Sequence, residues 1–445
     1  MGIIGFIAGV VSSINTRKGI RRMYKGANES NYIARSVLAM PYVDKVRLRL
    51  TSSIPEDMDV YDYQSQSATP GLDFVWGEND NIESSVISGG QPDERSRALL
   101  PFVHKCILSK TPILALHASN NALITMLEDN VGVCESVSRT GLYYDVFRTM
   151  PVEDMAHILY ETMDSTGPSV SPLIRALLET VIRKEGNVSL HNLAAFPITK
   201  IPDTLLAMQL SGEITRDEYD SIHRDYMAGS AEVETLRAFL GKLSRQADSL
   251  YGKARAKTCN MKKVLNQSGA VAIDVGLSNN DLIVPLVINH LKLLQSMGRD
   301  FALIIDGVAI SRFLPMLDLL RLTQYAICHS DFISSLHGGE RTGEELFVEV
   351  AGSANVIVLF NHRSGTSCQK WSDHMGKYQK IKVKQNISQA DNFAGGLFGS
   401  MIGRGNTHSV GREEVDEPRI RAEALSMLTD SLACIHRNEI LLAKI

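Results

Sequence analysis

Short apolar runs alternate with amphipathic segments over the first part of the chain that can be assigned. Residues 84–90 and 112–119 predict buried strands, and residues 94–107 between them carry apolar side chains at helical spacing. A short helix is predicted over 120–128. Strand, helix and strand in this order predict a βαβ unit, in which the two strands are parallel.

A long block with only helical periodicity follows. From residue 153 to about 255, apolar residues recur every three or four positions, and no strand run interrupts them. Thr215 and Glu218 have the spacing of a capping box, which marks the start of one of these helices. We therefore expect an all-helical block inserted into an α/β pattern.

The α/β pattern returns after this block. Strands are predicted at 269–276, 301–310, 325–330, 355–362 and 378–385. Helices between them are predicted at 280–297, 315–322, 344–353 and 368–376. Strands that are apolar on both faces and joined by helices predict a mostly parallel sheet. The Gly- and Ser-rich segment 392–412 predicts a surface loop, and residues 417–445 predict a helix followed by a short strand.

These patterns divide the chain into four parts. They are a basic amphipathic segment at 1–26, an extension at 27–83, a split α/β domain formed by 84–150 and 265–445, and an all-helical inserted domain at 151–264.

The amino-terminal segment combines an apolar run with a basic stretch. Residues 3–14 are apolar, but a membrane-spanning helix needs about 20 such residues, so we expect no crossing here or elsewhere. Five cations follow the run, and no acid appears before Glu29; they are Arg17, Lys18, Arg21, Arg22 and Lys25. Two interpretations stay open: contact with an anionic membrane surface, or packing on this or a neighbouring subunit.

Composition narrows the class of protein. The chain has 445 residues, of which 44% are hydrophobic and 22% charged, with a net charge of −4. These values exclude a disordered chain and argue against a protein that coats nucleic acid over its whole surface. Six cysteines are scattered singly, which excludes a disulfide scaffold and indicates reduced thiols in the cytoplasm. They are Cys106, Cys134, Cys259, Cys328, Cys368 and Cys434.

Five stretches, in order along the chain, carry a resemblance to one family. They are residues 85–103, 114–130, 143–163, 301–331 and 415–445. Over about 85–445 the chain resembles the type IV coupling proteins of bacterial conjugation, the TraD/TraG class of the FtsK/HerA-like motor ATPases. The resemblance implies a RecA-like, mostly parallel sheet flanked by helices and interrupted by an all-α inserted domain. It also implies a nucleotide site built from Gly89, Gly90, Arg95, Ser96 and Asp306, with Ser96 and Asp306 holding Mg²⁺ if Mg-ATP binds.

The stretch at the place of the phosphate loop departs from the working pattern. G-x-x-x-x-G-K-[ST] lets successive backbone N–H groups surround the phosphates. In the octet 89–96, Pro92 removes an N–H donor, and Glu94 stands at the second glycine. Asp93 and Glu94 bring two negative charges, and one like-charge pair at about 4 Å costs about 4 kcal/mol at an effective dielectric of about 20. We expect no tight binding of ATP.

The second acidic motif departs in the same way. Asp306 ends an apolar run as a Mg²⁺ ligand would, but Gly307 follows it where the family has the glutamate that polarises water. The family's glutamine after the next strand is replaced within residues 328–331. Loss of three catalytic groups together predicts a domain that does not hydrolyse ATP and has no cofactor.

Three functions remain open. The first is a coupling-protein-like, degenerate scaffold or substrate receptor of a conjugation or type IV secretion apparatus, which binds other apparatus proteins and docks a substrate complex on its helical domain. The second is an active hexameric translocase of DNA or protein with ATP and Mg²⁺, in which Asp306 is the catalytic-site residue. The third is a structural protein of a mobile element. For the first two we expect an oligomer, located in the cytoplasm or peripherally at the inner membrane.

Other residues have more ordinary interpretations. His117 could line a pocket at the sheet edge with Ser119, Asn120 and Asn121, but a buried histidine bonded to backbone is commoner, and Asp274 fits a cap or turn.

Ser367 and Cys368 lack the surroundings of a nucleophile. Lys380, Lys382 and Lys384 would share one face of a strand, as a phosphate-binding surface or, more commonly, as a guarded sheet edge.

Overall fold

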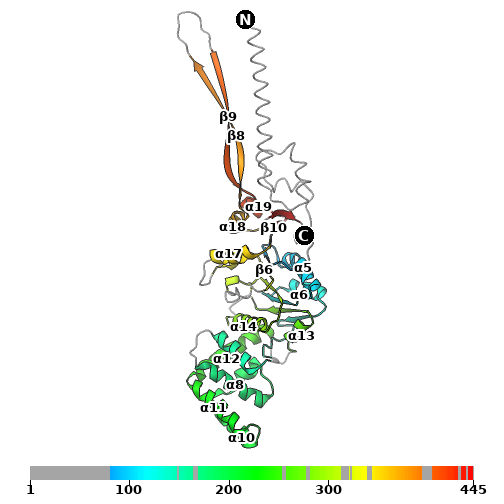
Figure 1. Cartoon of the computed structure of the whole chain (residues 1–445), viewed down its shortest axis with the longest axis vertical. Coiled ribbons are helices and arrows are strands. Elements are labelled where there is room, and N and C mark those ends of the chain that lie inside the picture. Colours follow the sequence, from blue (N-terminus) through cyan, green and yellow to red (C-terminus); the bar gives the residue numbers. More distant parts are fainter. Residues whose placement is uncertain are drawn as a thin grey trace, which may run out of the picture. The chain divides into compact units, whose positions relative to one another are not determined.

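The structure is a computed structural model of the whole chain, shown in Figure 1. It describes residues 81–147, 150–163, 169–252, 257–276, 281–311, 320, 323–337, 343–392, 403–428, 432–436 and 439–443. The predicted segment 1–26, most of the extension 27–83 and the predicted helix at 315–322, apart from Leu320, lie outside the described residues. The chain separates into two compact units, one formed by Glu78–Ala354 and the other containing the elements from Asn355 onward.

A parallel sheet forms the centre of the first unit. Its described strands are β1 (Ser85–Ser88), β2 (Ile113–His117), β3 (Cys134–Val137), β4 (Ala270–Asp274), β5 (Ala302–Asp306) and β6 (Tyr325–His329). Within this unit the order is β1-β6-β5-β2-β4-β3, and each neighbouring pair is parallel. The strands are almost completely buried apart from β3, whose Cys134–Ser136 are half-buried. The mostly parallel, two-side-buried sheet predicted from the apolar runs is confirmed.

Helices join these strands. They are α5 (Pro92–Leu108), α6 (Asn121–Asn130), α13 (Met261–Asn266), α14 (Ile283–Ser296), α16 (Phe332–Ser335) and α17 (Gly343–Ser353). Pro92 begins α5, because proline has a helical φ and its missing N–H has no intrahelical partner at that position. Leu99, Phe102 and Val103 of α5 are fully buried, as the predicted apolar spacing requires.

The inserted block is helical throughout its described part, and it forms the green region of Figure 1. Its α-helices are α7 (Val152–Met163), α8 (Val170–Glu185), α9 (Leu190–Ala195), α10 (Ile201–Ser211), α11 (Arg216–Gly229) and α12 (Val233–Tyr251). Two short 3-10 turns, η1 (Ile198–Lys200) and η2 (Ser230–Glu232), join some of them. The capping box is present, since Thr215 N donates to Glu218 Oε2 at 2.8 Å and Glu218 N donates to Thr215 Oγ1 at 3.2 Å.

The chain enters and leaves the helical block along two adjacent backbone segments. Tyr143 N donates to Lys257 O at 2.8 Å, and Cys259 N donates to Tyr143 O at 3.0 Å. The two segments therefore form a short parallel bridge between Tyr143 and Thr258. We call residues 143–147 and 257–260 the neck.

The second unit has antiparallel pairing. Strands β7 (Val356–Leu359), β10 (Leu432–His436) and β11 (Glu439–Ala443) pair in the order β11-β10-β7. Helices α18 (Gly365–Met375) and α19 (Ala422–Ser426) pack together, with Trp371 fully buried and Ser372 Oγ donating to Ile420 O at 2.6 Å. The prediction of one helix and one strand in the tail is wrong in its second half, because β10 and β11 form a hairpin.

The region after α18 also differs from the prediction. Strand β8 (Lys377–Asn392) pairs antiparallel with β9 (Gly403–Pro418) over their whole length, in a two-stranded ribbon outside the main sheet. Figure 1 shows this ribbon. The predicted strand at 378–385 is thus correct, but its place in a parallel sheet is wrong, and the predicted loop at 392–412 is wrong over 403–412. Ladder hydrogen bonds to β8 overcome the weak strand preference of Gly and Ser there.

Two further sequence expectations can be compared with the fold. None of the six cysteines, all of which lie in the described residues, forms a disulfide. Among the described residues, no helix is both long enough and apolar enough to cross a membrane.

Candidate functional site

The carboxyl ends of three neighbouring strands bring the predicted site residues together. In the sheet register His117 of β2 lies level with Asp274 of β4 and Asp306 of β5. Strand β1 ends at Ser88, and the chain then turns into α5. Because ligands of open α/β sheets bind at this edge, it is the natural place for a functional site.

The turn between β1 and α5 depends on its two glycines. Gly89 and Gly90 have φ angles of 89° and 71°, a region that side chains with a Cβ rarely adopt. Gly89 N donates to His329 O at 3.0 Å and so fixes the turn against β6. Helix α5 begins at Pro92, so five residues of the octet 89–96 are helical, and only Gly89, Gly90 and Gln91 form the loop.

A carboxylate of the protein itself is bonded at the start of α5. Glu94 Oε2 accepts a hydrogen bond of 2.6 Å from the backbone N–H of Gln91. The unpaired N–H groups and the positive end of the helix dipole attract anions to such a helix start. Glu94 therefore occupies a position at which a phosphate oxygen would be stabilised.

Arg95 and Asp306 form a buried ion pair. Arg95 Nε lies 2.8 Å from Asp306 Oδ1, and the two side chains are only 5% and 1% exposed. Arg95 Nη1 also donates to Gly90 O at 2.8 Å. The cation that the resemblance assigns to the phosphate-loop lysine is thus paired with the carboxylate that it assigns to Mg²⁺.

Asn120 completes the network around this pair. Its Nδ2 donates to Asp306 Oδ2 at 2.6 Å and to Ser96 Oγ at 3.3 Å. Its Oδ1 accepts from Leu123 N at 3.2 Å and so caps α6. Ser96 Oγ donates to Pro92 O at 2.9 Å. Both oxygens of Asp306 therefore accept hydrogen bonds from protein side chains, and the Ser96 hydroxyl is held by its own helix.

His117 lies beside this network and is fully buried. Its Nδ1 accepts from Asn120 N at 3.1 Å, while its Nε2 has no hydrogen-bond partner among the described residues. Burial lowers the pKa of His117, although the nearby Asp274 and Asp306 oppose that shift. The sequence left two interpretations of His117 open, a pocket residue or, more commonly, a buried histidine bonded to backbone. The bond from Asn120 N has the second form.

The remaining sequence candidates have structural partners. Asp274 Oδ1 accepts from Ser119 N at 3.0 Å and from Gly276 N at 2.9 Å, so it holds two loops together as a turn residue. Gly307 has a φ angle of 71°, which a glutamate could adopt only with strain.

Ser367 and Cys368 are buried in α18, where Ser367 N donates to Ser364 Oγ at 3.3 Å and Cys368 Sγ donates to His362 O at 3.5 Å. Lys380, Lys382 and Lys384 lie in strand β8.

The arrangement was only partly visible in the sequence. Arg95, Ser96 and Asp306 meet as the resemblance implies, and Gly89 and Gly90 form the adjoining turn. The role of Asn120 was missed, although an asparagine directly before a helix is a cap signal. Among the described residues, no group of three or more His, Cys, Asp or Glu side chains could hold a metal ion.

Comparison with known proteins identifies the fold. No protein-family model matches the sequence, and no curated protein matches it either. The plasmid coupling protein TrwB in complex with the non-hydrolysable ATP analogue ADPNP is 11% identical, with a TM-score of 0.50 over 92% of each chain. Unbound TrwBΔN70 is 12% identical, with a TM-score of 0.48 over 81% of this chain and 84% of that one.

VirB4 of Thermoanaerobacter pseudethanolicus is 11% identical, with a TM-score of 0.45 over 83% of this chain and 91% of that one. At such identities the likeness concerns the fold. The chain has the RecA-like fold of the type IV coupling proteins, as the resemblance implied.

Proposed function

We propose that this protein is a coupling-protein-like component of a conjugation or type IV secretion apparatus, and that it acts as a scaffold or substrate receptor without hydrolysing ATP. The observation that carries the second part is the buried Arg95–Asp306 pair. The coupling-protein fold supports the first part. The argument against catalysis has three steps, which concern the phosphates, the metal and the water.

The phosphate position lacks the donors of a working loop. A phosphate loop needs several consecutive N–H groups that point into one concavity. Here Pro92 has no N–H, the N–H of Gln91 is bonded to Glu94, and the N–H of Arg95 is bonded to Gln91 O. A triphosphate would have to displace the Glu94 carboxylate and lie beside its charge, because α5 starts too early for the chain to curve around the phosphates.

The metal position is occupied by protein groups. The residues of the right type are present, since a hydroxyl and a carboxylate are ordinary Mg²⁺ ligands. However, Asp306 bonds to Arg95 and Asn120, and Ser96 bonds to Pro92 O. Metal binding would require breaking an ion pair that is shielded from water. Leaving one buried charge without its partner costs about 3–5 kcal/mol.

The water-activating position has no side chain. Gly307 follows Asp306 directly, so no carboxylate there can orient an attacking water. Even a chain that bound Mg-ATP would therefore lack this part of the hydrolytic site. TrwB binds ADPNP; in this chain Arg95 and Asp306 pair with each other.

A receptor role places the partner surface on the helical block. On α10, Leu206 and Leu210 are four residues apart and therefore lie on one helix face, and Leu210 is 80% exposed. Exposed leucines at this spacing are suited to contact with an apparatus protein or a substrate complex. An oligomer, contact with DNA and attachment at the inner membrane are further expectations of this proposal.

The decisive experiment measures nucleotide binding and turnover in the purified full-length protein. We expect calorimetry with Mg-ATP and with ADP to give no saturable binding below about 1 mM. We also expect turnover below about 0.1 s⁻¹, since enzymes of ordinary efficiency run at about 1–1000 s⁻¹. Faster turnover that is abolished in Arg95→Ala and retained in Arg97→Ala would instead show that the protein hydrolyses ATP, and would contradict the proposal. Arg97 is the control because it is exposed on the same helix.

A gain-of-binding variant tests the cause. The double variant Glu94→Gly with Arg95→Lys removes the internal carboxylate and restores G-x-x-x-x-G-K-S at residues 89–96. We expect it to bind ATP more tightly than the natural chain while remaining without turnover, because Gly307 is unchanged. Equal nucleotide binding by both chains would show that Glu94 and Arg95 are not what prevents it.

A further inference from the structure

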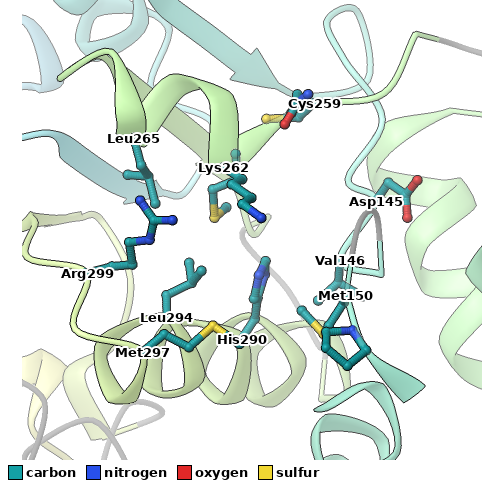
Figure 2. A pocket seen from close by; sticks show the side chains of 13 residues that line it. Asp145, Val146, Met150, Cys259, Lys262, Leu265, His290, Leu294, Met297 and Arg299 are labelled. Atoms are coloured by element: carbon teal, nitrogen blue, oxygen red, sulfur yellow. The ribbon is translucent and has the colours of Figure 1, made fainter. Parts of the chain in front are cut away.

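A cavity of about 310 Å³ lies at the neck (Figure 2). Neither Arg95 nor Asp306 lines it. Both neck segments line it, through Asp145 and Val146 on one side and Cys259 and Asn260 on the other. The rest of its wall comes from Met150 and Pro151 just before α7, from α13, and from α14 with the turn that follows it. The cavity is thus built from the α/β part and from the connections of the helical block, within one compact unit.

The lining is mainly apolar. Its apolar side chains are Val146, Met150, Pro151, Met261, Leu265, Leu294 and Met297. Methionine side chains are flexible and polarisable, so the three of them can fit ligands of different outline. A volume of about 300–1000 Å³ with apolar walls and a few polar groups is typical of small-molecule sites.

The polar groups of the cavity carry an excess of positive charge. Figure 2 shows Lys262 and Arg299 projecting into the same open space from α13 and from the turn after α14. Arg299 bonds to Asn266 Oδ1, and neither cation forms an ion pair within the part of the chain that the structure describes. Asp145 is the one acidic residue of the lining, and its Oδ1 accepts from Phe147 N at 3.3 Å.

His290 adds a neutral polar group to the wall. It projects from α14, and its Nδ1 lies 2.7 Å from the hydroxyl of Tyr144 in the neck. Burial lowers the pKa of His290 to about 4, so it is uncharged at neutral pH. The site therefore offers two cations together with a mainly apolar wall that includes residues of both neck segments.

We propose that this cavity binds a small anion with an apolar body, such as a medium-chain carboxylate, whose charged end lies against Lys262 and Arg299. The apolar end lies against the methionines and leucines. The ligand then contacts both neck segments and α14, so it restrains the helical block relative to the sheet. This site is independent of the proposed role of the Arg95–Asp306 pair.

The test uses octanoate as the probe and octanamide as its uncharged counterpart, titrated into the full-length protein by calorimetry. We expect saturable octanoate binding with a Kd below about 1 mM and at least tenfold weaker binding of octanamide. The double variant Lys262→Gln with Arg299→Gln should weaken octanoate binding at least tenfold. Lys263→Gln should leave it unchanged, because it removes a lysine charge from the same helix at a position outside the cavity.

A bulky substitution in the cavity and amide hydrogen exchange test the proposal independently if the double variant folds poorly. Met297→Trp, at a position 49% exposed and so tolerant of bulk, should block octanoate. Octanoate should also slow amide exchange at residues 143–147 and 257–260 in the natural chain. Absent binding, equal binding of octanoate and octanamide, or binding unaffected by Met297→Trp would each overturn the proposal.

Discussion

The network around Asp306 and the cavity at the neck both contain basic side chains. These side chains have an ionic partner in the network but not in the cavity, among the described residues. Arg95 is buried and bonded to a carboxylate that is itself bonded to Asn120. Lys262 and Arg299 face open space without an ionic partner among the described residues. A buried ion pair whose hydrogen bonds are all made within the protein is suited to stabilise the fold. Cations without an ionic partner, in a cavity with mainly apolar walls, are suited to bind a ligand. The two regions therefore differ in whether their cations already have ionic partners within the described residues.

Removal of the central carboxylate should have the largest effect on this contrast. Asp306→Ala leaves the buried Arg95 uncompensated and should lower the free energy of unfolding by about 3–5 kcal/mol. Urea and thermal unfolding followed by circular dichroism measure the change. Asp300→Ala, at an exposed position just before β5, should stay within about 0.5 kcal/mol. Recovery of most of the loss in Arg95→Met with Asp306→Leu would confirm that unpaired charge is the cause.

The asparagine of the network should have the next largest effect. Asn120→Ala removes the cap of α6 and the donor to Asp306, so we expect a loss of about 2–3 kcal/mol. Asn260 provides the matched control, because it caps α13 through Lys263 N at 3.1 Å without reaching a buried ion pair. Asn260→Ala should cost about 1 kcal/mol. Equal losses in the two variants would mean that the bond to Asp306 contributes little.

The third prediction concerns pH and the wall of the cavity. The pKa of His290 is about 4 in the folded chain and about 6.5 when unfolded, so the unfolded state binds more protons between these values. Stability from this group is complete above about pH 6.5 and falls as the pH is lowered, by about 2 kcal/mol at pH 5.

The variant His290→Gln keeps a side chain able to hydrogen-bond to the Tyr144 hydroxyl and should be less sensitive to acid than the natural chain. The measured quantity is the difference in Tm between pH 7.5 and pH 5. His104→Gln, at an exposed position of α5, should retain the full sensitivity. An identical acid dependence in His290→Gln and the natural chain would contradict the prediction.

The smallest effect on stability is expected at Lys262, which lines the cavity. Lys262→Gln should change the free energy of unfolding by less than about 0.5 kcal/mol, since its charge has no ionic partner to lose. Arg95→Gln, which also removes one positive charge, should cost several kcal/mol because it leaves Asp306 buried without its cation. Similar losses in the two variants would remove the distinction between a structural and a binding region.

Several elements could be predicted because their determinants are local. The sequences of β2, β4 and β5 are continuously apolar, which favours a strand buried on both faces whatever the strand order. The spacing of Thr215 and Glu218 marks the start of α11 through contacts within four residues. Strand β3 escaped prediction because its residues are partly polar and only half-buried. Strand β9 was not predicted because its pairing with β8, and not its composition, makes it a strand.

The sequence by itself determined that the octet 89–96 departs from the G-x-x-x-x-G-K-[ST] pattern, since it has a proline without an N–H and a glutamate at the second glycine position. It also placed Arg95 and Asp306 as candidates for one site. Only the tertiary structure decided that these two neutralise each other, that Asn120 joins them, and that Lys262 and Arg299 line one cavity beside the neck. The reason is that an ion pair or hydrogen bond depends on the distance between side chains far apart in the chain. That distance is set by the strand order and by where the helices begin.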